Sequence, residues 1–284
     1  MLAGGRFAKN AVETVPVQAS GLLDLGALEA ALDGHDSKAG LSLVAVHWAN
    51  NETGVIQPVR DIAALVKAKG GVLVVDAVQA LGRVSIDITE GCGDYLILSS
   101  HKIGGPKGAG AFVAASDLMM PMPLIAGGGQ ERGHRGGTEA VANLAGFGAA
   151  AEVAAETVAQ FGDRAGIRDR FERTILDIAP DAIIHGGDAP RLANTLFFTI
   201  PGLKAETMQI AFDLAGLAVS AGSACSSGKV GRSHVLTAMG FNSDEGAIRV
   251  SFGRETGEDA VAKFGEAFHK IVARARPENR LERA

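Results

Sequence analysis

The chain has 284 residues, a formal net charge of −5 and a hydrophobic content of 47%. This length allows one large domain or one and a half, and the composition indicates a buried globular core. The charges are scattered, which argues against a nucleic-acid partner or a membrane-surface patch. No apolar run approaches the roughly 20 residues that span a bilayer, and residues 1–20 lack the pattern of a secretory signal. Two cysteines, Cys92 and Cys225, argue against a disulfide framework and favour a reducing, cytoplasmic compartment.

The first part of the chain has the period of an α/β protein. Between residues 41 and about 115, short apolar runs alternate with amphipathic stretches, which predicts a mostly parallel sheet with crossover helices. One of these stretches, 58–69, has apolar residues at helical spacing and is followed by Gly70, so it predicts a capped helix. An alanine-rich segment over 139–161 then predicts a long helix that bridges two domains.

The remainder of the chain has a mixed α+β pattern. We therefore expect a large α/β domain over 1–150 and a smaller α+β domain over 151–284, with the boundary inside the long helix. The elements predicted after the boundary are a helix over 164–178, a strand over 194–200, a helix over 204–215, strands near 217–222 and 247–252, and a helix from about 257 to 275.

Three apolar runs, 43–49, 72–75 and 95–98, end in polar side chains. Ligands of open α/β sheets bind outside the carboxyl ends of the strands, so three such endings in order predict a site. The polar residues are Asn51 after the first run, Asp76 and Gln79 after the second, and Ser99, Ser100, His101 and Lys102 after the third.

Lys102 leaves an apolar strand and enters the Gly/Pro turn 103–108. Partial desolvation there would favour the neutral amine, which is the form that Schiff-base chemistry needs. The hydroxyls and the imidazole just before it are hydrogen-bonding groups suited to a phosphate. Taken alone, the string is more typical of a surface turn with a solvated lysine, and the neighbouring strand ends favour the site.

The two cysteines differ in their surroundings. Cys92 is interpreted as a small buried hydrophobe, the usual state of a free cysteine. Cys225 lies in the run 220–229 of small and polar residues, which cannot build a core and predicts a mobile loop. Lys229 and Arg232 follow it closely and favour the thiolate form, so Cys225 is the candidate nucleophile.

Six strings, taken together, resemble the class V aminotransferase family of pyridoxal-phosphate enzymes, and within it the cysteine desulfurases. They run in the family's order from near residue 41 to near residue 256. The resemblance implies the fold of the pyridoxal-phosphate-dependent transferases. The strings are ANNETGVIQPV, VDAVQALGRVSIDI, SSHKIGGPKGAGAF, GGGQERGHRGGTEAVANLAGFG, SAGSACSSGKVGRSHVL and IRVSFGRET.

The resemblance implies pyridoxal 5′-phosphate as cofactor, bound by the residues at the strand ends. Lys102 would hold it as a Schiff base and move the proton of the substrate's α-carbon. Asp76 would pair with the pyridine nitrogen, and Gln79 with the ring hydroxyl. Asn51 would contact the ring or the substrate. Ser99, Ser100 through its backbone, and His101 would bind the phosphate, and Thr138 matches a residue offered to the phosphate of a partner subunit in a homodimer.

The same resemblance implies a substrate and a route for its sulfur. Arg249 would grip the carboxylate of L-cysteine with a bidentate fork, although a strand arginine taken alone is usually solvent-facing. Cys225 would carry the sulfur as a persulfide to a sulfur-acceptor or iron–sulfur scaffold protein, leaving L-alanine. The histidines show no metal-site spacing, so no zinc is assigned, and Cys225 is a candidate for a transient iron–sulfur ligand only.

Two alternatives stay open at this point. The protein could be a selenocysteine lyase or another class V transaminase, although a plain transaminase would not require the Cys225 loop. It could also be a non-catalytic remnant that binds a partner. The family's opening segment carries a Gly-Gly-Thr-Glu-like phosphate loop and a histidine that stacks on the ring, and Met1 matches a point beyond it. The sequence leaves open a short protein, a mis-called start and a fragment.

Overall fold

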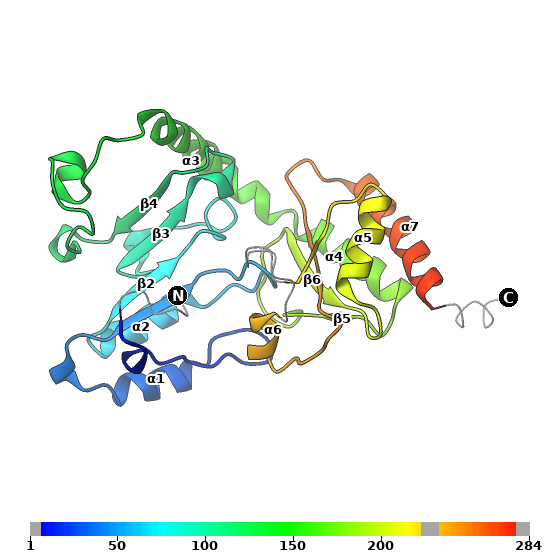
Figure 1. Ribbon diagram of the computed structural model, residues 1–284, viewed down its shortest axis with the longest axis horizontal. Coiled ribbons are helices and arrows are strands. Elements are labelled where there is room, and N and C mark those ends of the chain that lie inside the picture. Colours follow the sequence, from blue (N-terminus) through cyan, green and yellow to red (C-terminus); the bar gives the residue numbers. More distant parts are fainter. Residues whose placement is uncertain (1–6, 223–232, 277–284) are drawn as a thin grey trace. The chain divides into compact units, whose positions relative to one another are not determined.

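The computed structural model describes residues 7–222 and 233–276 and divides the chain into two compact units (Figure 1). The division falls within helix α3 (Val141–Gly162), as does the boundary near residue 150 that the sequence predicts. Two short segments from the first part of the chain join the second unit. Unit 1 comprises Met1–Val15, Leu25–Ala49 and Gln57–Ala159, and unit 2 comprises Pro16–Asp24, Asn50–Ile56 and Gln160–Ala284.

Unit 1 contains a four-stranded sheet in the order β1-β2-β3-β4 (Figure 1). The first three strands are parallel to one another, and β4 is antiparallel to β3. The mostly parallel sheet that the sequence predicts is confirmed. The strands are β1 (Leu43–His47), β2 (Val72–Asp76), β3 (Tyr95–Ser99) and β4 (Gly110–Ala114).

Helix α2 (Val59–Ala68) supplies the crossover between β1 and β2. It buries Ile62 and Val66 at helical spacing and packs against β2, which confirms the helix that the periodicity over 58–69 predicts. Gly70, with a φ of +70°, ends it in the left-handed conformation that glycine adopts most easily. Unit 1 also contains α1 (Leu25–Asp33), which contacts α2, and most of α3.

The sheet of unit 1 buries one face and leaves apolar side chains exposed on the other. Leu73 and Val75 are two positions apart in β2 and both lie on the buried face. On the opposite face, Ile97 of β3 lies directly across from Phe112 of β4, and both side chains are exposed. The Phe112 ring stacks on Tyr95 at a centroid distance of 4.9 Å, so its other side faces outward.

Unit 2 is built on a sheet in the order β5-β6-β8-β7 in which every neighbouring pair is antiparallel. The α+β pattern predicted from the sequence is confirmed, while β5 and α6 are too short to leave a periodic signal. The strands are β5 (Ile183–Ile184), β6 (Thr195–Thr199), β7 (Ser220–Ala221) and β8 (Ile248–Ser251), and the helices are α4 (Ala165–Ile178), α5 (Ala205–Leu214), α6 (His234–Ala238) and α7 (Glu258–Ala275).

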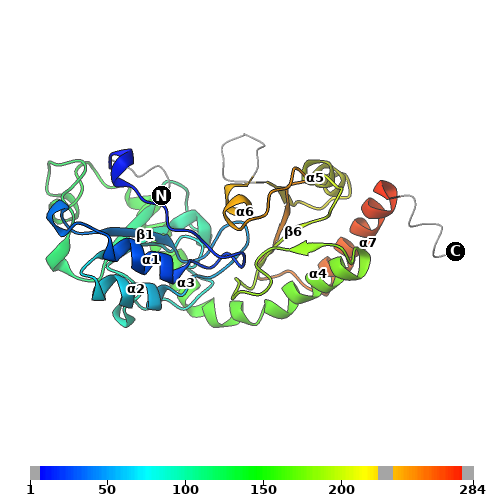
Figure 2. The same cartoon turned by 90° about the horizontal axis from the view of Figure 1, so that it is seen from below.

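The core of unit 2 is a cluster of stacked aromatic rings between its helices and its sheet. Helix α7 packs against both α4 and α5, and Figure 2 shows α4 and α7 side by side. Phe212 of α5 stacks on Phe264 of α7 at 5.2 Å, and Phe171 of α4 meets Phe264 edge-on at 5.3 Å. These buried rings fix the helices on one face of the sheet. Among the helices of residues 7–222 and 233–276, none combines the length and apolar character of a membrane-crossing segment.

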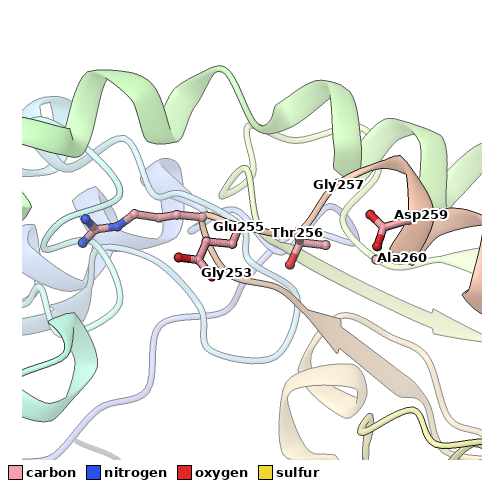
Figure 3. A pocket seen from close by; sticks show the side chains of 7 residues that line it. Gly253, Glu255, Thr256, Gly257, Asp259 and Ala260 are labelled. Carbon is pink, nitrogen blue, oxygen red and sulfur yellow. The ribbon is translucent and has the colours of Figure 1, made fainter.

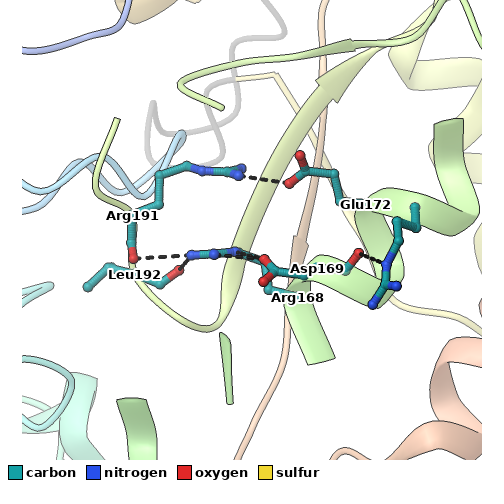
Figure 4. A network of polar contacts seen from close by, with 6 residues as sticks. Arg168, Asp169, Glu172, Arg191 and Leu192 are labelled. Carbon is teal, nitrogen blue, oxygen red and sulfur yellow. Dashed lines mark hydrogen bonds and ion pairs between the residues drawn. The ribbon is translucent and has the colours of Figure 1, made fainter. Parts of the chain in front are cut away.

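A polar network joins α4 to the segment that leads into β6 (Figure 4). The Arg191 guanidinium donates to the Glu172 carboxylate at 2.7 Å, and its side chain is only 5% exposed. Arg168 donates to the backbone carbonyls of Arg191 and Leu192, both at 3.2 Å, and pairs with Asp169. Removing one partner of such a buried ion pair leaves a charge uncompensated, so the network constrains this segment.

His185 is buried beside β6 and is held in one tautomer. Thr199 donates its hydroxyl to the carbonyl of Gly246 at 2.7 Å, so the His185 ring Nε2–H donates to Thr199 Oγ1 at 2.8 Å. Phe241 packs edge-on against the ring at 4.7 Å. Burial lowers the pKa of His185 from its ordinary value of 6.5 to about 4.

We expect the free energy of unfolding to depend on this histidine between pH 6.5 and about pH 4. The unfolded chain binds the proton first as the pH falls, so stability is full above 6.5 and drops by up to about 3 kcal/mol towards pH 4. Chemical denaturation of His185→Gln across this range should give a flatter profile. His269→Gln, at an exposed position of α7, is the control, and an unchanged profile in His185→Gln would contradict the assignment.

Candidate active site

The parallel register of unit 1 places the carboxyl ends of β1, β2 and β3 at one edge of the sheet. Asp76, the last residue of β2, is paired in register with Ile97 of β3. Ser99 lies two residues beyond Ile97 and therefore on the same face of the sheet as Asp76. The structure thus brings together two of the strand ends that the sequence singles out.

Asp76 is half-buried, and one of its two carboxylate oxygens accepts a hydrogen bond. Its Oδ1 accepts the backbone N–H of Val78 at 3.0 Å, which fixes the carboxylate over the turn that follows β2. None of the described residues donates a hydrogen bond to Oδ2 of Asp76. The carboxylate is therefore oriented by the chain and still has an oxygen for a further donor.

Lys102 lies in a single 3₁₀ turn, Ser100–Ile103, directly after β3. Its side chain is half-buried, whereas that of Lys107 farther along the loop is exposed. Ser99 Oγ and His101 Nδ1 are hydrogen-bonded at 2.9 Å, so a hydroxyl and an imidazole lie beside each other at the strand end. The lysine therefore follows a hydroxyl–imidazole pair on a short, tightly turned segment.

The packing of this turn requires glycine at position 105. Gly105 donates its backbone N–H to the carbonyl of Ser100 at 3.1 Å. A Cβ at this position would lie 2.3 Å from Ser100 Oγ, well inside van der Waals contact. Ser100 is fully buried and its Oγ has no hydrogen-bond partner among residues 7–222 and 233–276, so the hydroxyl fills the turn. The glycine at position 105 thus permits close packing against Ser100 in the turn that contains Lys102.

Arg83, which the sequence pattern does not single out, joins two turns at the candidate site. Its guanidinium donates to the carbonyl of Gln79 at 3.0 Å and to the carbonyl of Lys102 at 3.1 Å. Burial lowers the pKa of Arg83. One cation therefore ties the Gln79 turn to the Lys102 turn. The sequence feature that could have indicated Arg83 is its position four residues after Gln79, within one of the six strings.

Arg249 and Asn51 belong to unit 2. Arg249 lies in β8 between β6 and β7, and its Nη1 donates to the backbone carbonyl of Asn51 at 2.7 Å. Nη2 reaches Ser220 Oγ at 3.3 Å, and the buried Nε has no hydrogen-bond partner within the described part of the chain. The arginine is thus half-buried in the sheet and hydrogen-bonded to neutral oxygens. This position differs from that of a strand arginine whose side chain points into solvent.

Thr138 and Cys225 are two further residues that the sequence predicts to act at the site. Thr138 is exposed in the segment before α3, where Arg135 donates to the carbonyl of Gly137 at 2.9 Å and pairs with Glu131. Its role toward a partner subunit stays a prediction. Cys225 lies outside the described residues. Within residues 7–222 and 233–276, no group of three or more His, Cys, Asp or Glu side chains is arranged to hold a metal ion.

A separate hollow of about 610 Å³ opens in unit 2 between β8 and α7 (Figure 3). The Thr256 carbonyl in its wall accepts a hydrogen bond from Arg164 at 2.8 Å. None of the predicted site residues lines it, so its chemistry is not that of the strand ends. The lining residues are Gly253, Arg254, Glu255, Thr256, Gly257, Asp259 and Ala260.

Comparison with known proteins identifies the family. The model described as "Aminotransferase class-V" matches residues 5–264, and the chain belongs to this family. A cysteine desulfurase from Nostoc sp. is 38% identical over 270 residues, which cover 93% of this chain and 66% of that protein. The chain therefore spans about two thirds of the length of such relatives.

Solved structures give the same result. A NifS-like protein from Rickettsia africae has a TM-score of 0.85 and 33% sequence identity, covering 95% of this chain and 71% of that chain. A structure described as "SspA in complex with cysteine" has a TM-score of 0.69 and 30% identity, covering 85% of this chain and 65% of that chain. The fold-level resemblance to pyridoxal-phosphate-dependent transferases is confirmed.

The cofactor of this family is pyridoxal 5′-phosphate, and the donor set at the edge of the unit 1 sheet fits it. Asp76 offers an uncommitted carboxylate oxygen, which suits a protonated ring nitrogen. The Ser99–His101 pair offers donors suited to a phosphate, and Lys102 offers a primary amine on the turn that follows.

We expect Arg83→Met to weaken cofactor binding by tenfold or more. Methionine keeps much of the side-chain volume but loses two charge-assisted hydrogen bonds, each contributing about 1.5–3 kcal/mol. Absorption titration with pyridoxal 5′-phosphate measures the affinity. Arg60→Met, at an exposed position of unit 1 that pairs with Glu90, is the control. Equal affinities of Arg83→Met and the unaltered protein would show that Arg83 does not position the site.

Proposed function

We propose that this protein carries the activity of a cysteine desulfurase, which converts L-cysteine to L-alanine and leaves the substrate sulfur as a persulfide on Cys225. The observation that carries the proposal is the joint placement of Asp76, Ser99, His101 and Lys102 at one sheet edge. The relative from Nostoc sp. supports it, since it is a cysteine desulfurase rather than a selenocysteine lyase. The structure of SspA with cysteine supports the choice of substrate.

The proposed roles follow from the chemistry of each side chain. The cofactor, when bound, supplies an electron sink that stabilises negative charge at the substrate's α-carbon. The Lys102 amine would hold the cofactor as a Schiff base and would take the proton from the substrate's α-carbon. Asp76 keeps the ring nitrogen protonated, and Gln79 orients the ring. Ser99 and His101 hold the phosphate, with the backbone of Ser100.

Substrate recognition is assigned to the arginine of β8. Among the described residues, Arg249 has one guanidinium nitrogen on the Asn51 carbonyl, while Nη2 makes a long contact with Ser220 Oγ and Nε makes no hydrogen bond. A guanidinium held in place on neutral oxygens keeps its full charge for the substrate carboxylate. Asn51 then has two roles. Its backbone carbonyl orients Arg249, and its side chain is the proposed contact to the cofactor ring or the substrate.

Sulfur transfer is assigned to Cys225. Its thiolate attacks the substrate sulfur, so a sulfur–sulfur bond forms while the bond between substrate carbon and sulfur breaks. The electron pair stays with the substrate's β-carbon, which takes up a proton, and Lys102 would return a proton to the α-carbon to give L-alanine. The sum is L-cysteine and a thiol giving L-alanine and a persulfide, which balances without an external oxidant. A sulfur-acceptor or iron–sulfur scaffold protein would then receive the sulfur, and a cytoplasmic homodimer is the proposed setting.

The direct test is the position of the cofactor link. After incubation with pyridoxal 5′-phosphate and reduction with borohydride, peptide mapping should find the adduct on Lys102. Lys102→Ala should lose this adduct and the formation of L-alanine from L-cysteine. Lys107→Ala removes an exposed lysine of the same loop and should retain both. An adduct on Lys107, or turnover by Lys102→Ala, would refute the assignment.

A further inference from the structure

Glu52 is a buried carboxyl group in the turn that carries Asn51. Glu52 is only 2% exposed. The turn is rigid because Asn50 Oδ1 accepts the backbone N–H of Glu52 at 2.8 Å and that of Thr53 at 3.0 Å. A second clamp joins the ends of the turn, where the N–H of Asn50 donates to the carbonyl of Val55 at 2.9 Å. The backbone therefore fixes where the Glu52 side chain starts.

Ser233 holds the end of this side chain. Its hydroxyl donates to Glu52 Oε2 at 2.5 Å, and the same Oγ accepts the N–H of Leu236 at 3.1 Å as the N-cap of α6. Ser233 is itself buried. The contact links residues 181 positions apart in the chain, and along the sequence Ser233 follows the segment 223–232 that contains Cys225.

The Glu52 carboxyl interacts electrostatically with Arg249 but is not paired with it. Burial raises the pKa of Glu52, while the Ser233 hydrogen bond and the charges of His234 and Arg249 oppose that rise. Among the described residues, no carboxylate forms an ion pair with Arg249, whose contacts are the Asn51 carbonyl and Ser220 Oγ. The nearby carboxyl is thus directed to a hydroxyl and not to the guanidinium.

We propose that Ser233 and Glu52 are positioning residues for substrate binding: the Ser233 hydroxyl holds the Glu52 carboxylate away from Arg249 and so keeps the guanidinium open to the substrate carboxylate. The inference rests on the proposed function, in which Arg249 binds the carboxylate of L-cysteine. A carboxylate freed from Ser233 would be a bidentate partner for Arg249 and would compete with the substrate for the same donors.

The test is a double-mutant cycle on the protein loaded with pyridoxal 5′-phosphate. Ser233→Ala should raise the KM for L-cysteine about tenfold, the effect of losing about one charge-assisted hydrogen bond to the substrate, and leave kcat within about twofold. Glu52→Gln in the Ser233→Ala background should restore the KM, because the neutral amide does not compete for Arg249. Ser233→Thr keeps the hydroxyl and should behave as the unaltered protein.

A purely structural role predicts a different pattern. If Ser233→Ala acted only through the lost helix cap, adding Glu52→Gln would leave the KM raised, and that result would overturn the inference, as would an unchanged KM in Ser233→Ala. Affinity for L-alanine, measured by absorption titration, provides a readout without turnover and should follow the same order. Absence of turnover in the unaltered protein would count against the proposed function, while the L-alanine series would still decide the inference.

Discussion

The parallel register of β1, β2 and β3 is the constraint on which the unit 1 site depends. It aligns Asp76 with β3 and so places a carboxylate beside the strand that delivers Ser99 and the Lys102 turn. Backbone hydrogen bonds enforce this register, and a slip by one residue would turn Asp76 to the buried face of the sheet. Arg83 then ties the two turns that follow the strands, so the ladder and one buried cation fix the relative positions of the polar groups.

In unit 2, as in unit 1, a strand and a neighbouring turn position the charged side chain. Its arginine is placed by the central strand β8, and the turn 50–56 supplies the carbonyl that orients the guanidinium. Neutral oxygens hold Arg249, while the buried carboxyl of Glu52 is directed to Ser233. A cation arranged in this way is oriented without being neutralised, which is the electrostatic state that suits recognition of an anionic substrate group.

Much of this organisation could be predicted from the sequence, because strand ends and helices leave periodic signals. The runs before Asp76 and Lys102 fall in β2 and β3 as expected, and the helix over 164–178 is α4. The contacts of Arg83 and Glu52 could not be predicted, since each depends on a partner brought close only by tertiary folding. Arg249 likewise took its role from the resemblance, because its half-buried position depends on β7 pairing beside it.

In the proposed function, sulfur leaves L-cysteine and is carried by one cysteine of this chain, Cys225. The most direct measurement is a single-turnover reaction of the protein, loaded with pyridoxal 5′-phosphate, followed by alkylation and mass spectrometry of its peptides. We expect one additional sulfur atom on the Cys225 peptide and an equal amount of L-alanine. Additional sulfur on the peptide of the buried Cys92, or L-alanine formed with no sulfur on either cysteine, would contradict it.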